Sequence, residues 1–279
     1  MRRATTAASI VLMSAAVMAL ASATPAFAVT PNVYNSIPST LPGNIPSQPF
    51  QAQQTNEFGD MIKFAPGTSS TLKAVRVVMS SWACETGAWN TNDCVTTPGA
   101  TFSIPITFSV YQVNAGTPPT KGTVITSVTR VFNIPYRPSA SVECTGDNLG
   151  KWYSAADDTC YNGFANTILF KFTGLHVTLP TQAIYGITYN TSGYGYNPEG
   201  YDNPCNTATE GCPYDSLNVG AYAGLPSRGT DKYPDGVFLN SSNAGVYCPG
   251  DTGPTDTFRL DDGCWTGYNP LVRFTVKAA

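Results

Sequence analysis

The residues that could do chemistry in this chain are one histidine, eighteen carboxylates and eight cysteines. A single histidine excludes any site that needs two imidazoles. His176 alternates with apolar residues in segment 174–179, and this pattern predicts a strand with His176 on the solvent side. A catalytic base would need a nucleophile beside it, and the sequence has no Gly-x-Ser-x-Gly motif. We therefore predict that His176 is an inert surface residue.

Two well-placed carboxylates would be enough to cleave a glycoside. Glu57 and Asp60 flank Phe58-Gly59 at the start of a predicted strand. Asp favours turns because it hydrogen-bonds to its own backbone, and we interpret most of the carboxylates as solvated turn residues. We predict no catalytic residue, with a carboxylate-dependent polysaccharide hydrolase as the alternative. The turn carboxylates are Asp157, Asp158, Asp202, Asp215, Asp231, Asp235, Asp251, Asp256, Asp261 and Asp262.

Metal sites have little support in the sequence. Oxygen-rich loops can hold calcium, but no Asp-x-Asp-x-Asp-Gly run of the EF-hand kind occurs. Zinc is disfavoured because there is no Cys-x-x-Cys and the one histidine is remote from every cysteine. We predict no cofactor and no metal ligands, and leave structural calcium as an open alternative.

The eight cysteines all follow the first 28 residues, and an even number in an exported chain is typical of a disulfide framework. Each successive pair brackets one polar segment rich in Gly, Asn and Asp, which favours pairing between nearest neighbours. Such bonds would stabilise each loop by about 2–4 kcal/mol by restricting the unfolded chain. The predicted pairs are Cys84–Cys94, Cys144–Cys160, Cys205–Cys212 and Cys248–Cys264.

Residues 1–28 have the order of a secretory signal peptide: a basic start at Arg2 and Arg3, an apolar run over 10–21, and Ala26-Phe27-Ala28 as a cleavage site. No later segment has the ~18 consecutive apolar residues of a membrane span. Without the two leader arginines the charge balance is 13 − 18 = −5. This acidity argues against a nucleic-acid partner, because such proteins carry basic patches. We expect a secreted, extracellular protein.

The remaining sequence is organised as short strands. Prolines recur every few residues over 29–50, which predicts an extended segment, and its apolar residues suggest that it docks on the domain surface. From residue 51 to 279 apolar residues alternate with period two, as in Ile104–Val110 and Ile168–Phe172, between turn signals such as Asp235-Gly236. The predicted fold is all-β, a single large antiparallel β-sandwich or jelly-roll-like domain with long disulfide-pinned loops.

Aromatic residues supply the most suggestive binding pattern. All four tryptophans lie close to cysteines, and the chain between Tyr189 and Tyr222 is rich in Tyr, Gly and Asn. Exposed aromatic faces beside polar groups can hold a sugar ring. The alternative is that each Trp packs over its neighbouring disulfide. The candidate ligand-binding residues are Trp89, Trp152, Tyr194, Tyr196, Tyr201 and Trp265.

Several motifs, spread over nearly the whole chain after the leader, resemble a group of exported actinobacterial β-proteins with no established activity. The resemblance implies export and one domain, and it transfers no catalytic residue. The motifs are YNSIP (34–38), LPGNIPS (41–47), EFGD (57–60), SSWAC (80–84), IPYRPS (134–139), CPYDSLNV (212–219) and GCWTGY (263–268).

Taken together, these patterns predict a non-catalytic extracellular binding or surface-associated module, with an extracellular or cell-wall glycan as its ligand class. The alternatives are the polysaccharide hydrolase named above and a structural surface-layer component. A hydrolase would bring two carboxyls ~5–10 Å apart in a groove, whereas a binder needs only aromatic faces. The sequence leaves the oligomeric state open.

Overall fold

The computed structural model describes residues 31–66, 70–89, 92–189, 217–222 and 224–277. The predicted leader therefore lies outside the described residues. So do the predicted Cys205–Cys212 bond and three of the candidate binding residues, Tyr194, Tyr196 and Tyr201.

The described residues form an all-β fold, as predicted, and its strands are joined by turns and two short 3-10 segments, Gly146–Asn148 and Ala244–Val246. The strands are β1 (Asn32–Asn35), β2 (Ser47–Pro49), β3 (Thr55–Lys63), β4 (Leu72–Ser81), β5 (Thr101–Asn114), β6 (Thr120–Pro135), β7 (Trp152–Ser154), β8 (Thr159–Tyr161), β9 (Phe164–Lys171), β10 (Gln182–Thr188), β11 (Leu217–Tyr222), β12 (Thr230–Asp231), β13 (Gly236–Ser241), β14 (Arg259–Asp262), β15 (Asn269–Pro270) and β16 (Val272–Val276).

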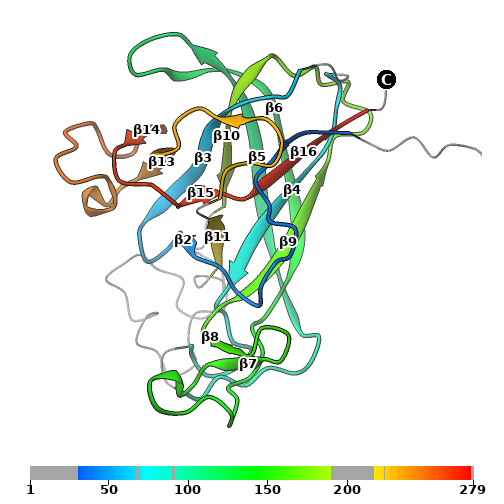
Figure 1. The fold of residues 1–279 in the computed structure, drawn as a ribbon, viewed down its shortest axis with the longest axis vertical. Helices are drawn as coiled ribbons and strands as arrows, with labels where there is room; N and C mark the ends of the chain where they lie inside the picture. Colours follow the sequence, from blue (N-terminus) through cyan, green and yellow to red (C-terminus); the bar gives the residue numbers. More distant parts are fainter. Residues whose placement is uncertain (1–30, 67–69, 90–91, 190–216, 223, 278–279) are drawn as a thin grey trace, which may run out of the picture.

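These strands build two antiparallel sheets. Sheet A has the order β1-β16-β4-β11-β15, with β2 paired to β11 and β9 paired to β4. Sheet B has the order β14-β13-β3-β10-β5-β6, with β12 paired to β3. The small hairpin β7-β8 lies at the lower end of the molecule in Figure 1, beyond the strands of both sheets.

The two sheets pack face to face over one apolar core. The Phe108 ring of sheet B lies 5.4 Å from the Phe170 ring and 5.7 Å from the Phe274 ring, both of sheet A. This contact follows from the period-two pattern, because alternate residues of each strand point to the same face. The alternation that predicted strands at Ile104–Val110 and Ile168–Phe172 thus identifies their core-facing residues. Jelly-roll connectivity stays a prediction.

Apolar residues are also buried on the outer faces of both sheets. On sheet B, Met61 and Ile184 cluster with Leu260 of β14 and with Phe258, which directly precedes β14. On sheet A, Val78 is covered by Ile37 and Ile45 of the proline-punctuated segment. That segment is docked on the domain as expected. It is also part of sheet A through β1 and β2, so the predicted boundary at residue 50 does not separate two structural units.

Three of the four predicted disulfides are present: Cys84–Cys94, Cys144–Cys160 and Cys248–Cys264. Each closes a local loop with a sequence separation of 10 or 16 residues, and their Cα–Cα distances of 5.4–5.9 Å are ordinary for the bond. Disulfides of this kind indicate a non-reducing, extracellular environment. In the described part of the chain, no helix has the length and apolarity needed to cross a membrane.

Candidate functional site

The predicted aromatic platform is wrong for Trp152 and Trp265, which are only 7% and 6% exposed. The Trp152 indole donates a hydrogen bond to the Gly163 carbonyl oxygen at 2.6 Å and packs on Tyr161 in the β7-β8 hairpin. Trp265 packs on Phe58 of β3, in the main core. Trp152 lies within the loop closed by Cys144–Cys160, Trp265 directly follows Cys264, and each indole packs against an aromatic residue of a strand. They fit the packing alternative.

Trp89 is the remaining candidate within the described residues. It is half-buried and meets Trp82 edge to face, with ring centroids 4.9 Å apart. The Trp82 indole in turn donates a hydrogen bond to Ser80 Oγ at 3.0 Å. This pair offers one partly open aromatic surface and does not form a platform with Trp152 or Trp265, which belong to separate packing clusters.

His176 is exposed, as predicted, but it lies in a turn after β9 and not on a strand. Its φ of 49° is left-handed, which breaks the expected alternation. Leu175 is accordingly 52% exposed, whereas Val177 is buried. Together with Lys73 and Lys277, His176 lines a hollow of about 360 Å³ at the end of β4.

Asp231 and Asp261 contradict the interpretation as solvated turn residues, because both are buried. Glu57 and Asp60 lie on β3, at the predicted strand, and their side chains are buried as well. Glu57 Oε1 accepts a hydrogen bond from the Tyr111 hydroxyl at 2.7 Å and lies in the space left by Gly186, where a Cβ would be 2.0 Å from it. Burial raises the pKa of Glu57, while Tyr111 and the charge of Lys121 oppose that rise. Sequence reasoning missed these residues because Asp and Glu are rarely buried.

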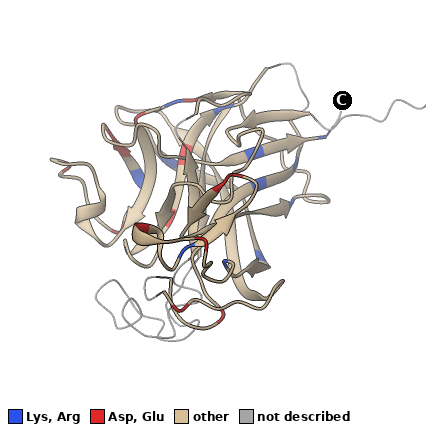
Figure 2. Cartoon of the chain, turned by 60° about the horizontal axis from the view of Figure 1, so that its bottom comes forward, with Lys and Arg blue, Asp and Glu red and all other residues tan. Residues whose placement is uncertain are grey.

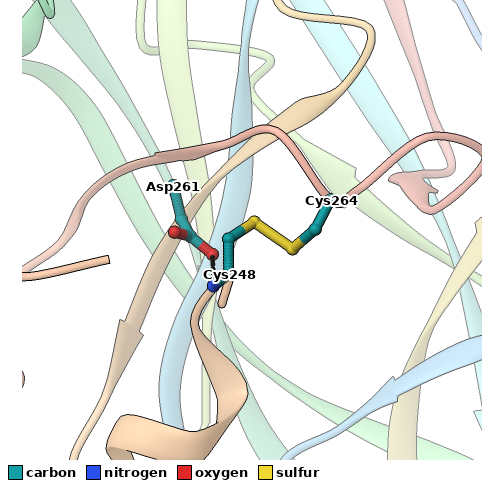
Figure 3. Close-up of side chains that lie close together, drawn as sticks. All are labelled: Cys248, Asp261 and Cys264. Atoms are coloured by element: carbon teal, nitrogen blue, oxygen red, sulfur yellow. Dashed lines mark hydrogen bonds between the residues drawn. A yellow bond between two sulfur atoms is a disulfide. The ribbon is translucent and has the colours of Figure 1, made fainter. Parts of the chain in front are cut away.

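Asp261 lies beside the Cys248–Cys264 disulfide, as Figure 3 shows. The two sulfurs are bonded to each other, so this cluster has no thiolate to bind a metal. Asp261 Oδ2 accepts hydrogen bonds from the Cys248 amide at 3.0 Å and from the Trp265 indole at 2.6 Å. The carboxylate therefore fixes the disulfide loop and the indole against β14.

The carboxyl of Asp251 lies within hydrogen-bonding reach of Asp261 and bonds to it when one of the two carries a proton. Burial, followed by this hydrogen bond, raises the pKa of Asp261 to about 6. The same bond, followed by the 2.7 Å salt bridge to Arg259, lowers the pKa of Asp251 to about 2. Asp261 is 1% exposed, so the pair does not present two carboxyls to a substrate.

The strongest surface feature is a row of basic residues across the outer face of sheet A. Arg228 is opposite Asn35, Asn35 is opposite Arg273, and Arg273 is opposite Arg76. Lys171 of β9 is opposite Ala74, two residues along β4 from Arg76. We call Arg76, Lys171, Arg228 and Arg273 the basic row.

The basic row is held in place by neutral partners. Arg76 Nη1 donates to Thr167 Oγ1 and Arg273 Nε donates to Asn35 Oδ1, each at 2.9 Å. The one salt bridge among the described residues is Arg259–Asp251, so no described carboxylate neutralises the row. Like charges directly opposite each other on neighbouring strands are destabilising. A bound anion would therefore reduce the repulsion between Arg76 and Arg273.

Charge is distributed unevenly between the sheets. The described strands of sheet A carry Lys73, Arg76, Lys171 and Arg273 and no Asp or Glu. The buried acids Glu57, Asp60, Asp231 and Asp261 all belong to sheet B. Figure 2 shows blue segments on the strands that lie nearest the C-terminus.

The basic row is also open. The proline-punctuated segment covers the part of sheet A around Val78, whereas Arg76 and Arg273 are half-buried and Lys171 is exposed. The row continues toward the hollow of about 360 Å³, since Lys73 lies three residues before Arg76 on β4. The arrangement can bind an extended anion along the row and seat one of its units in the hollow.

No protein-family model, curated protein or solved structure matches this chain.

Proposed function

We propose that this chain is a secreted, non-catalytic binding protein for an anionic extracellular glycan, which it holds along the basic row. The observation that carries the proposal is the pairing of Arg76 directly opposite Arg273 in a sheet whose described strands contain no acidic residue. The leader predicted at residues 1–28 and the three disulfides support export.

Glycan chemistry suits this face better than a neutral sugar platform does. Guanidinium groups bind carboxylate and phosphate oxygens through paired N–H donors, and a row of them fits charges repeated along a polymer. The hollow lined by Lys73, His176 and Lys277 has the size of a small-molecule site, which suits one sugar unit. Two of the three described candidate tryptophans are buried, so stacking contributes less than charge.

A binding measurement tests the proposal with one polysaccharide in a charged and an uncharged form. The mature protein is titrated with polygalacturonate and with its fully methyl-esterified form, which keeps the sugar and removes the charge. We expect binding to the charged polymer alone, weakened as salt rises above about 0.15 M because exposed charges are then screened. Equal binding of both forms would overturn the charge-based mechanism.

Matched variants locate the site. Arg76→Gln/Arg273→Gln should weaken binding about 5- to 30-fold, because each exposed ionic contact contributes about 0.5–1 kcal/mol. Arg130→Gln/Lys232→Gln removes the same charge from exposed positions outside sheet A and should leave binding unchanged. Equal weakening by both double variants, or equally tight binding of a DNA duplex, would contradict a specific glycan face. Release of new reducing ends from the polymer would favour the hydrolase alternative.

A further inference from the structure

A group of polar side chains lies inside the otherwise apolar core, where β3, β10, β12 and β15 approach β1. Asp60 is directly opposite Tyr185, and both side chains lie on the core face of sheet B beside Phe58 and Ile62. Asp231 of β12 is directly opposite Ile62, so it shares that face and is the diagonal neighbour of Asp60. Diagonal neighbours of this kind have Cα atoms about 7–8 Å apart and are within reach of a common ligand.

Asn269 completes the group, which we call the internal polar cluster: Asp60, Asp231 and Asn269. The Asn269 amide nitrogen donates a hydrogen bond to Asp231 Oδ2, while Asp231 Oδ1 accepts one from the Tyr233 amide at 2.8 Å. Asp60 Oδ1 accepts one from the Met61 amide at 2.6 Å. All three residues are buried: Asp60 is 0%, Asp231 5% and Asn269 9% exposed.

Two oxygens of the internal polar cluster are buried and have no hydrogen-bond partner among the described residues. They are Asp60 Oδ2 and Asn269 Oδ1. Because buried acceptors without a partner are costly, such atoms in a folded protein call for a ligand. The Asn269 amide group is fixed against the Asp231 carboxylate by its bond to Oδ2.

Among the residues that the structure describes, no Lys or Arg side chain contributes to the pKa of Asp60 or Asp231. The hydroxyls of Tyr185 and Ser36 both donate to the Pro270 carbonyl oxygen, at 3.3 and 3.1 Å, and so are directed away from the carboxylates. Burial, and then the charge of Asp231, raise the pKa of Asp60 well above its usual value. Burial and the charges of Asp60 and Asp231 also raise the pKa of Tyr34. Two carboxyl groups that are diagonal neighbours in a buried, otherwise apolar setting thus stand without a cationic partner among the described residues, and one bound cation would satisfy both.

We propose that the internal polar cluster binds one calcium ion, with Asp60, Asp231 and Asn269 as its side-chain ligands. The donor set consists of oxygens alone, with two negative charges, which is the chemistry of calcium and not of zinc or copper. Calcium tolerates irregular sites and takes 6–8 oxygens, so water and backbone carbonyls would complete the shell.

Calorimetry of the full mature protein tests this site. Protein dialysed against EDTA is compared with the same protein titrated with CaCl2, with KCl of equal ionic strength as the blank. At a calcium concentration 100-fold above its Kd, we expect Tm to rise by about 5–10 °C. Absence of any calcium-dependent rise would overturn the proposal. So would a Tm that responds to acid alone, because the two carboxyls would then share a proton instead of an ion.

Variants distinguish the internal polar cluster from surface carboxylates. Asp60→Asn and Asp231→Asn should abolish the calcium-dependent rise, and Asn269→Ala should weaken calcium binding about tenfold. Asp256→Asn, which removes an exposed carboxylate, should respond like the parent protein. A full calcium response in Asp60→Asn would overturn the assignment.

A measurement on the parent protein covers the case in which the variants do not fold. Terbium replaces calcium in oxygen sites and emits when excited through a nearby tyrosine, and Tyr34 and Tyr185 both lie beside the cluster. We expect terbium emission that calcium suppresses and potassium does not. No sensitised emission would contradict the site.

Discussion

Replacing Asp261 with asparagine should make the protein more stable at pH 7. Asp261 is held next to the Asp251 carboxylate, and its pKa is raised to about 6 from an ordinary value of 3.8. Since the folded protein binds this proton more tightly than the unfolded chain, the contribution of Asp261 to stability is greatest below about pH 4 and is lost as the pH rises to above 6. Each tenfold change in proton affinity corresponds to about 1.36 kcal/mol, so Asp261 lowers the free energy of unfolding at pH 7 by at most about 3 kcal/mol.

Asparagine reproduces the protonated state at every pH. Its Oδ1 can accept from the Cys248 amide and the Trp265 indole, as Asp261 Oδ2 does, while its Nδ2 donates to Asp251. We therefore expect the free energy of unfolding of Asp261→Asn to be about 1–3 kcal/mol higher than that of the parent at pH 7. At pH 4 the two values should agree within about 1 kcal/mol.

Urea unfolding measures the free energy of unfolding of the parent and of the variant. It is followed by tryptophan fluorescence at pH 4, 5, 6 and 7, with the disulfides intact. Asp256→Asn is the control, because it removes an exposed carboxylate from the same loop and should keep the parental pH dependence. Parallel pH profiles for the parent and Asp261→Asn would refute the reasoning, as would a variant less stable than the parent at pH 7.

Three further substitutions test the fold by urea unfolding. Arg273→Gln should raise the stability of the ligand-free protein by about 0.2–1 kcal/mol, because it removes the like charge opposite Arg76; a loss of stability would contradict that repulsion. Gly186→Ala should lower the free energy of unfolding by about 1–3 kcal/mol, since the added Cβ would displace the Glu57 carboxylate. An unchanged free energy of unfolding would mean that the carboxylate has room to move. Arg137→Lys should cost about 2 kcal/mol, because the buried guanidinium donates to two backbone carbonyls that one ammonium cannot reach together, and unchanged stability would exclude that role.

The strands and the disulfides could be predicted because both are local properties of the sequence. Alternation assigns the core faces of β4 and β9, and short spacing predicts the bonds at Cys84–Cys94, Cys144–Cys160 and Cys248–Cys264. The outer faces could not be read in this way. Val78 is buried by Ile37, a residue far from it in sequence, so its burial depends on where the proline-punctuated segment lies.

The candidate site was missed for a related reason. Arg76 and Arg273 each stand between two core-facing apolar residues, a pattern that places both on outer faces of strands. Their register as neighbours depends on β4 pairing with β16, nearly 200 positions later in the chain. The burial of Asp60 was missed because Asp is depleted in strands and is rarely buried.

The pairing of β1 with β16 also constrains the order of folding. β1 is the first described strand and β16 the last, and β16 separates β1 from the rest of sheet A. During synthesis from the N-terminus, β1 has no partner strand until the residues of β16 have been made, so sheet A cannot close on a growing chain. A chain whose sheet A stays open until β16 has been made can still be threaded through a narrow channel, and sheet A takes up its final form only after that strand is available.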